Sequence, residues 1–164
     1  MKMGKKLLAA MLLLTAFLFN EQLAMAQKSD SAQEASIKKM VDSKDYVFYV
    51  ESATPMSGRQ RFLTPGNTVH IAKDSVVCDL PYFGRVYTSS VNTTDGGIKF
   101  ISTSFDYTPE ARKKGGWDIA IKTKDVPETQ NLNFTIYDNG KAYLQVRSNN
   151  RQSISYNGYV AEKK

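Results

Sequence analysis

The second half of the chain alternates between apolar and polar side chains, which is the pattern of strands that bury one face. Three successive stretches show it without a break. Their apolar members are Trp117, Ile119 and Ile121, then Leu132, Phe134 and Ile136, then Ala142, Leu144 and Val146. We therefore expect three neighbouring strands that share one continuous inner face.

The turn between the second and third of these stretches is predicted by the same alternation. A two-residue turn at Asn139-Gly140 would set Ile136 against Tyr143 and place the two apolar sets on opposite faces. A three-residue loop over residues 138–140, with Gly140 left-handed, instead sets Ile136 against Ala142. We predict the three-residue loop.

The same alternation predicts the turn before the last strand. A three-residue loop over residues 149–151 aligns Val146 with Ile154 and Leu144 with Tyr156, so that the apolar face continues into the last strand. The last three strands are therefore predicted to form a meander.

Nine stretches rich in β-branched and aromatic residues are predicted as strands, and Gly, Pro, Asn or Asp separates nearly all of them. They are Tyr46–Ala53, Thr68–Ala72, Ser75–Asp79, Arg85–Val91, Ile98–Ser104, Trp117–Thr123, Leu132–Tyr137, Lys141–Ser148 and Ser153–Ala161. No long helical pattern lies between them. The pattern predicts an all-β fold, a single antiparallel barrel or sandwich of eight or nine strands over residues 45–164.

Residues 27–44 form a polar lead-in to this domain. Apolar residues recur there at rough helical spacing, and Ser31 precedes Glu34 as in a capping box. We expect a short N-terminal helix or a frayed lead-in.

Residues 1–26 have the three parts of a secretory signal peptide. Lys2, Lys5 and Lys6 precede the apolar run Leu7–Phe19, and Ala24-Met25-Ala26 offers small residues before a cleavage site. A helix of this run would cover only about 20 Å, which is too short for a bilayer core of about 30 Å. We expect an exported protein, periplasmic or secreted, cleaved near Ala26.

The amino-acid composition excludes several kinds of functional site. The chain has one Cys and one His, which excludes a disulfide within the chain, a Cys-rich zinc site and a multi-His metal site. We expect no metal and no cofactor. No later stretch is long and apolar enough to span a membrane.

The chain is basic, with 22 Lys and Arg against 16 Asp and Glu. The bases are scattered apart from residues 112–114, which read as a solvated turn or, alternatively, as a phosphate-binding patch. Three charges give weak affinity for polyanions, and an exported protein seldom meets nucleic acid, so we expect no nucleic-acid partner.

Several segments together resemble a known family. They are residues 80–85 (Leu-Pro-Tyr-Phe-Gly-Arg), 96–100 (Gly-Gly-Ile-Lys-Phe), 139–142 (Asn-Gly-Lys-Ala) and 150–158 (Asn-Arg-Gln-Ser-Ile-Ser-Tyr-Asn-Gly). In this order and spacing, the chain from about residue 36 to 161 resembles the bacterial domain-of-unknown-function family numbered 4251. The resemblance implies an exported envelope protein with a lipocalin-like β-barrel. It implies no activity and no catalytic residues.

The loop that contains Tyr82 and Phe83 is unusual because two large aromatic residues stand where polar ones are expected. They either plug one end of the barrel or rim a mouth and contact an apolar or sugar ligand, together with Arg85. The basic turn over residues 57–61 is the second unusual loop. Tyrosines predicted to point outward offer a further partner surface: Tyr87, Tyr137, Tyr143 and Tyr159.

Other candidate chemistry is sparse. His70 is expected to face solvent, and Cys78 is expected to be a buried, inert thiol. Asp-Ser-small sequences make Ser31 and Ser75 possible O-glycosylation sites. Five acids could supply a glycosidase pair but lie beside turns or on polar faces: Asp106, Glu110, Asp118, Asp125 and Glu128.

Two functional hypotheses follow, and neither is an enzyme. The first is a non-enzymatic binding module that holds a small hydrophobic or glycan-like molecule. The second is a structural or protein-interaction domain with a filled core that acts through its outer face. The partner is an unknown small molecule or envelope protein. The two differ in whether the barrel interior is open or is filled by large side chains, namely Phe100, Trp117, Phe134, Leu144 and Tyr156.

Overall fold

The computed structural model describes residues 31–87, 96–126 and 130–163. The predicted signal peptide, residues 1–26, lies outside the described residues. A helix over residues 31–43 precedes ten strands. The strands are β1 (Tyr46–Pro55), β2 (Arg61–Phe62), β3 (Thr68–Ile71), β4 (Val76–Leu80), β5 (Ile98–Ser102), β6 (Phe105–Ala111), β7 (Trp117–Thr123), β8 (Gln130–Ile136), β9 (Lys141–Ser148) and β10 (Ile154–Ala161).

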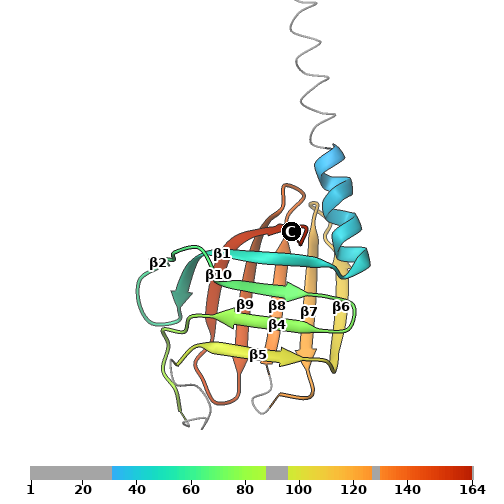
Figure 1. Cartoon of the computed structure of the whole chain (residues 1–164). Helices are drawn as coiled ribbons and strands as arrows, with labels where there is room; N and C mark the ends of the chain where they lie inside the picture. Colours follow the sequence, from blue (N-terminus) through green and yellow to red (C-terminus); the bar gives the residue numbers. More distant parts are fainter. Residues whose placement is uncertain (1–30, 88–95, 127–129, 164) are drawn as a thin grey trace, which may run out of the picture.

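The strands form one antiparallel sheet that curls into a nearly closed barrel. Its order is β5-β4-β3-β1-β10-β9-β8-β7-β6, with β2 beside β1. In Figure 1, strands β1, β3, β4 and β5 run across the view in front of the nearly vertical strands β6 to β9. A register shift in β1 between Val50 and Ser52 accompanies the change of direction between the two layers. The all-β, barrel-like fold predicted from the alternation is confirmed.

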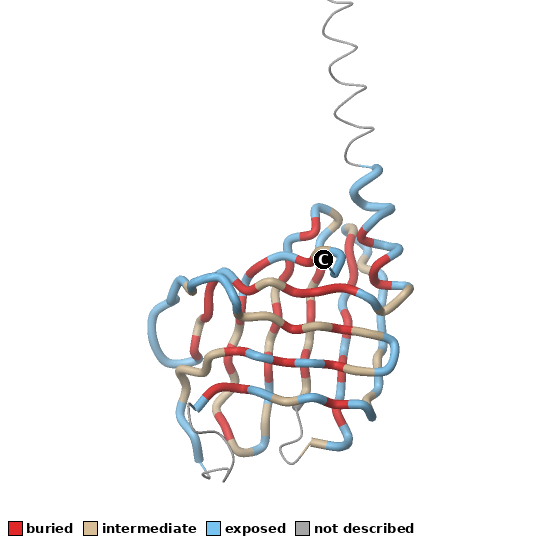
Figure 2. Tube along the Cα trace, viewed as in Figure 1, coloured by how far each residue is buried: buried red, intermediate tan, exposed pale blue. Residues whose placement is uncertain are grey.

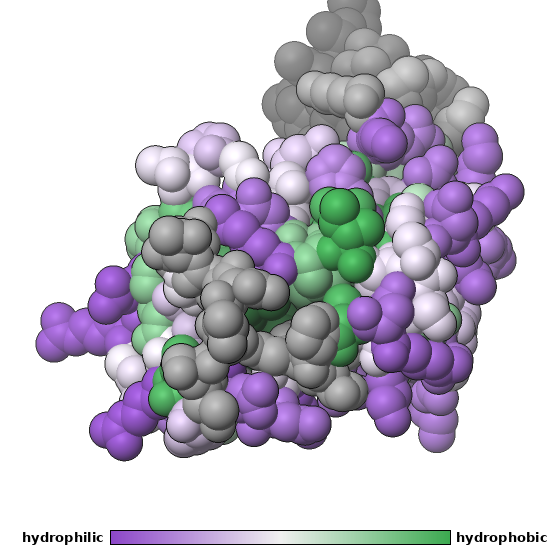
Figure 3. All heavy atoms as spheres, turned by 60° about the horizontal axis from the view of Figure 1, so that its bottom comes forward, coloured by the Kyte–Doolittle hydropathy of each residue, from purple (hydrophilic) through white to green (hydrophobic). Residues whose placement is uncertain are grey.

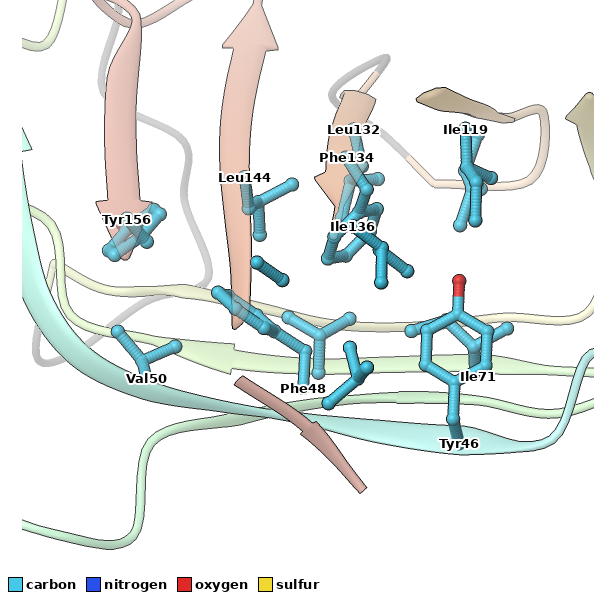
Figure 4. Packing of buried hydrophobic residues seen from close by; sticks show 14 of the residues in the cluster. Tyr46, Phe48, Val50, Ile71, Ile119, Leu132, Phe134, Ile136, Leu144 and Tyr156 are labelled. Atoms are coloured by element: carbon cyan, nitrogen blue, oxygen red, sulfur yellow. The ribbon is translucent and has the colours of Figure 1, made fainter. Parts of the chain in front are cut away.

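The core lies between these two layers. Along β7 and β4, buried and exposed residues alternate strictly, as Figure 2 shows. Side chains from the front layer, such as Phe48, meet side chains from the rear layer, such as Phe134 (Figure 4). The rings of these two residues pack edge to face with centroids 5.4 Å apart.

The N-terminal helix covers one end of the barrel. It buries Ile37, Met40 and Val41, and the Tyr107 hydroxyl of β6 donates a hydrogen bond of 3.1 Å to the Val41 carbonyl oxygen. Of the helices in the described part of the chain, none combines the length and the apolar character that crossing a bilayer requires.

Two strands were not predicted. β6 contains Pro109, which cannot donate a backbone hydrogen bond, but β6 ends the sheet and has one unpaired edge where proline is tolerated. β2 is only two residues long and lies in the segment that the sequence indicates as a basic turn. The predicted strand Arg85–Val91 is wrong in its described part, residues 85–87, where only an isolated bridge joins Val86 to Arg151.

The predicted loop over residues 138–140 is confirmed. Ile136 pairs with Ala142, and Gly140 has a φ of 77°, in the left-handed region that favours glycine. The register of the next turn is also as predicted, with Val146 opposite Ile154. However, pairing stops at these two residues, and the connection between β9 and β10 covers residues 149–153 because Arg151 bonds elsewhere.

Candidate functional site

The aromatic loop, predicted either to plug a barrel end or to rim a ligand site, lies at the end of the barrel opposite the helix (Figure 1), and its Tyr82 and Phe83 pack half-buried against the core. Figure 3 turns that end toward the viewer and shows apolar side chains within a hydrophilic surround. The Tyr82 hydroxyl lies 2.8 Å from the carbonyl oxygens of both Arg85 and Gln152, and its single proton is shared between these two acceptors. Tyr82 therefore fastens the 81–87 segment to the β9–β10 connection.

A buried arginine, which was not predicted from the sequence, holds the same end together. Arg151 is only 6% exposed, and its guanidinium donates to the carbonyl oxygens of Gly96 at 2.8 Å and Gly97 at 3.0 Å. It also lies 5.3 Å from the centroid of the Tyr82 ring. Beside it, the Tyr156 hydroxyl donates to the Pro81 carbonyl oxygen at 2.7 Å, and burial raises the pKa of Tyr156 well above its ordinary value.

The two unusual loops of the sequence come together in the structure. The Arg61 guanidinium lies 4.8 Å from the centroid of the half-buried Phe83 ring, and Arg59 and Arg85 are exposed nearby in the same two segments. A hydrogen bond from Gln152 to the Ser57 hydroxyl (3.2 Å) ties the first loop to the barrel end. We call Arg59, Arg61, Phe83 and Arg85 the arginine corner. Residues 52–73 and 80–87 contain no Asp or Glu, so the corner is electropositive.

His70 faces outward from β3, as predicted, between the buried Val69 and Ile71. It lines a surface pocket of about 160 Å³ with Val47, Val77 and Lys163 among its other walls. Ser75, one of the two predicted glycosylation sites, also lines this pocket and donates to the Asp74 carboxylate at 3.2 Å. Ser31, the other one, is exposed at the first position of the helix.

Three of the predicted acids, Asp106, Asp118 and Asp125, make hydrogen bonds or ion pairs with neighbouring residues. Asp125 accepts hydrogen bonds from the Ser102 hydroxyl (2.5 Å) and from the backbone N–H groups of Thr103 (2.7 Å) and Ser104 (3.0 Å). These bonds lower its pKa to about 2. Asp106 contacts Lys124. In the described ranges, no three His, Cys, Asp or Glu side chains come together in a way that would hold a metal ion.

Asp118 and Cys78 are two further predicted candidates, and the acid Glu110 is exposed on β6 directly opposite Asp118. Asp118 lies 3.4 Å from the Arg112 guanidinium and accepts a hydrogen bond from the Thr135 hydroxyl at 2.7 Å. Cys78 is buried as predicted, on the inner face of β4, and burial raises the pKa of its thiol. Glu128 lies outside the described residues.

The outer face of the sheet carries two adjacent rows of side chains, which run from the rear layer onto β1 and β2. In an antiparallel sheet, residues directly opposite one another share a face, so the register defines the rows. Row one comprises Thr108, Ala120, Asn133, Gln145, Ser155 and Thr54. Row two comprises Thr135, Tyr143, Asn157, Ser52 and Phe62. We call these the outer rows; none of their residues is charged.

The comparisons with known proteins agree with this fold. The family model of a domain of unknown function, DUF4251, matches residues 28–160. The chain belongs to the DUF4251 family. A solved DUF4251 family protein from Bacteroides eggerthii is similar in structure, with a TM-score of 0.60 and 12% identity over 83% of this chain and 91% of that one. At this identity the likeness shows the fold alone. No curated protein matches the chain.

Proposed function

We propose that this DUF4251 protein is a non-enzymatic binding domain of the bacterial envelope, and that it binds through the outside of a filled barrel. The envelope location rests on the signal-peptide pattern of residues 1–26. The proposal for the binding surface rests on the interior, which distinguishes the two hypotheses drawn from the sequence.

The interior is packed with large side chains, and this observation carries the proposal. Trp117, Phe134, Leu144 and Tyr156 are buried, and Phe100 packs against them while half-buried. Residues from both layers interdigitate there (Figure 4). The packing favours a filled barrel that acts through its outer face over one that holds a ligand inside.

The polar side chains at the barrel end support the same conclusion. The Tyr82 hydroxyl and the Arg151 guanidinium are directed at backbone carbonyl oxygens, where they hold loops together. The acids Asp106, Asp118 and Asp125 are engaged with neighbouring residues in the same way. These contacts are structural, which favours a domain without catalysis.

A second candidate is a small anionic ligand, hydrophobic or glycan-like, bound at the arginine corner. Arg85 and Arg61 are exposed there beside the Phe83 ring, in segments that hold no carboxylate. Guanidinium groups suit carboxylate and phosphate geometry, and the corner needs no opening of the core.

Native mass spectrometry on protein purified from the envelope of its host tests the proposal. We expect the mass of the bare chain, and covalent crosslinks to partners that map to outward-facing residues. A reproducible extra mass that is lost on denaturation, and that survives both R61S/R85S and the outer-row variant F62A/N133A/Q145A, would place a ligand in the interior and overturn the proposal. The same mass lost in that variant would select the arginine corner.

A further inference from the structure

We infer that the outer rows form a binding face for an uncharged glycan chain that lies across strands β8, β9, β10, β1 and β2. The inference rests on the proposed function, because it takes the binding surface to be outside the barrel. It assigns that surface a position and a class of ligand.

The absence of charge in the outer rows is the first observation. Charged residues make up 23% of the chain, and outward-facing strand positions are where they are normally found. Yet none of the eleven residues of the outer rows is charged. Ten of them are exposed or half-buried, and the eleventh, Ser52, is buried where its hydroxyl accepts from the Gln60 amide at 2.8 Å. Charges lie beyond them: the register continues row two through Asp118 and Glu110. The row next to row one holds Asp106, Lys122 and Arg147. A charged ligand would find no opposite charge here, so charge complementarity selects an uncharged one.

The hydrogen-bonding groups of the rows are the second observation. Amides and hydroxyls dominate, and each amide presents both donors and an acceptor, as sugar hydroxyls require. Within the described part of the chain, the side chains of Asn133 and Asn157 make no hydrogen bond with the protein. The Gln145 carbonyl oxygen accepts from Arg147 at 3.0 Å. This bond leaves the amide N–H₂ of Gln145 available to a ligand.

The aromatic residues in row two and beside it are the third observation. Phe62 is 86% exposed at the end of row two, which is extreme for a large apolar side chain. Tyr143 lies three strands further along the same row, roughly 14 Å away at the usual strand spacing. Beyond the rows, Tyr159 stacks on Tyr49 with ring centroids 5.3 Å apart. Flat aromatic faces separated by amides suit the alternation of apolar and hydroxyl faces along a chain of sugar rings.

The same composition argues against a protein partner. The centre of a protein interface is apolar and aromatic, with a polar rim. In the outer rows the order is reversed, because amides and hydroxyls occupy the centre and Phe62 stands at the edge. An anionic polymer is better served by the arginine corner, where the charges lie.

Affinity electrophoresis tests the inference, with purified protein run through gels that contain laminarin or mannan as uncharged polysaccharides, or alginate as a charged one. We expect at least one uncharged polysaccharide to retard the protein. F62A and N133A/Q145A should each weaken that affinity about tenfold, the range expected when an important contact of a binding site is removed. The matched control is M56A, since Met56 is also exposed, at 68%, but lies outside the rows.

Three results would overturn the inference: no retardation by either uncharged polysaccharide, retardation by alginate alone, or equal affinities of F62A and M56A. All the variants change exposed or half-exposed side chains, and unchanged melting temperatures would show that they fold. If glycans fail while crosslinks still map to the outside of the barrel, this inference falls and the proposed function stands. If a ligand is found in the interior of the barrel, both the proposed function and this inference are wrong.

Discussion

Ser102 donates a hydrogen bond of 2.5 Å to the carboxylate of Asp125, 23 positions further along the chain. Ser102 ends β5, and the N–H groups of the next two residues, Thr103 and Ser104, bond to the same carboxylate. One side chain from the β7–β8 connection thus holds the corner at which β5 turns into β6, the two strands that end the sheet.

The Asp125 contact makes stability depend on pH. Its folded pKa of about 2 lies below the ordinary value of 3.8, so the ionised form stabilises the fold. This stabilisation is complete above about pH 4 and is lost as the pH falls toward 2. We expect D125N to melt at a lower temperature than the wild type at pH 7, and the difference to shrink between pH 4 and pH 2. Melting curves by circular dichroism across that range would measure it, and a constant difference would contradict the assignment.

Replacement of Arg151 should destabilise the end of the barrel opposite the helix. The variant R151M leaves the buried carbonyl oxygen of Gly97 and the more exposed one of Gly96 without this charged donor, which we expect to cost about 2 kcal/mol of unfolding free energy. R151K should cost less, because an ammonium group can still donate to one carbonyl. Urea denaturation gives both values. If R151M were as stable as the wild type, the role of the buried guanidinium would be wrong.

A side chain at Gly158 should prevent the pairing of β1 with β10. A Cβ atom there would lie 1.9 Å from the Tyr49 carbonyl oxygen and 3.1 Å from the Val50 Cα atom, at the register shift of β1. We expect G158A to lose about 3 kcal/mol or more, because backbone cannot move aside as a flexible side chain can. N157A, one position away and facing outward, should change stability by less than about 0.5 kcal/mol. Equal stability of the two variants would rule out the close approach.

The Cys78 thiol should be unreactive in the folded protein. It is buried on the inner face of β4, and burial raises its pKa, so little thiolate forms near pH 8. Labelling with a disulfide reagent should be slow in buffer and rapid once guanidinium chloride has unfolded the chain and exposed the thiol. Rapid labelling in buffer would mean that β4 opens readily.

Alternation along the chain was sufficient to predict the rear layer. In β7 to β9 every second side chain is buried, so a slip of one residue would expose a whole apolar set, and only one register satisfies all three strands. The same constraint is absent from β6, where Pro109 and Glu110 are exposed and the burial pattern is weak. The strand exists because β7 offers an edge to pair with.

The candidate surfaces were less predictable because they depend on contacts between distant segments. Arg151 looks like an ordinary turn residue, and the carbonyl oxygens it binds are 54 and 55 positions away. Phe62 shares a row with Tyr143 only through the pairing of four strands. The two unusual loops were both visible in the sequence, but nothing in it places Arg61 over Phe83.

The sheet order carries a consequence for how the chain folds. Taken from β6 to β10 and on from β1 to β5, with the two-residue β2 set aside, the strands follow one another around the barrel as a simple meander, in which each ladder but one joins successive strands. The exception is β1 with β10, which pairs Val47 with Ala161. The entropy of closing a long loop is therefore concentrated in a single ladder. A circular permutant that joins the two ends and opens the Thr103-Ser104 corner would have only local ladders, and it should fold faster than the natural chain.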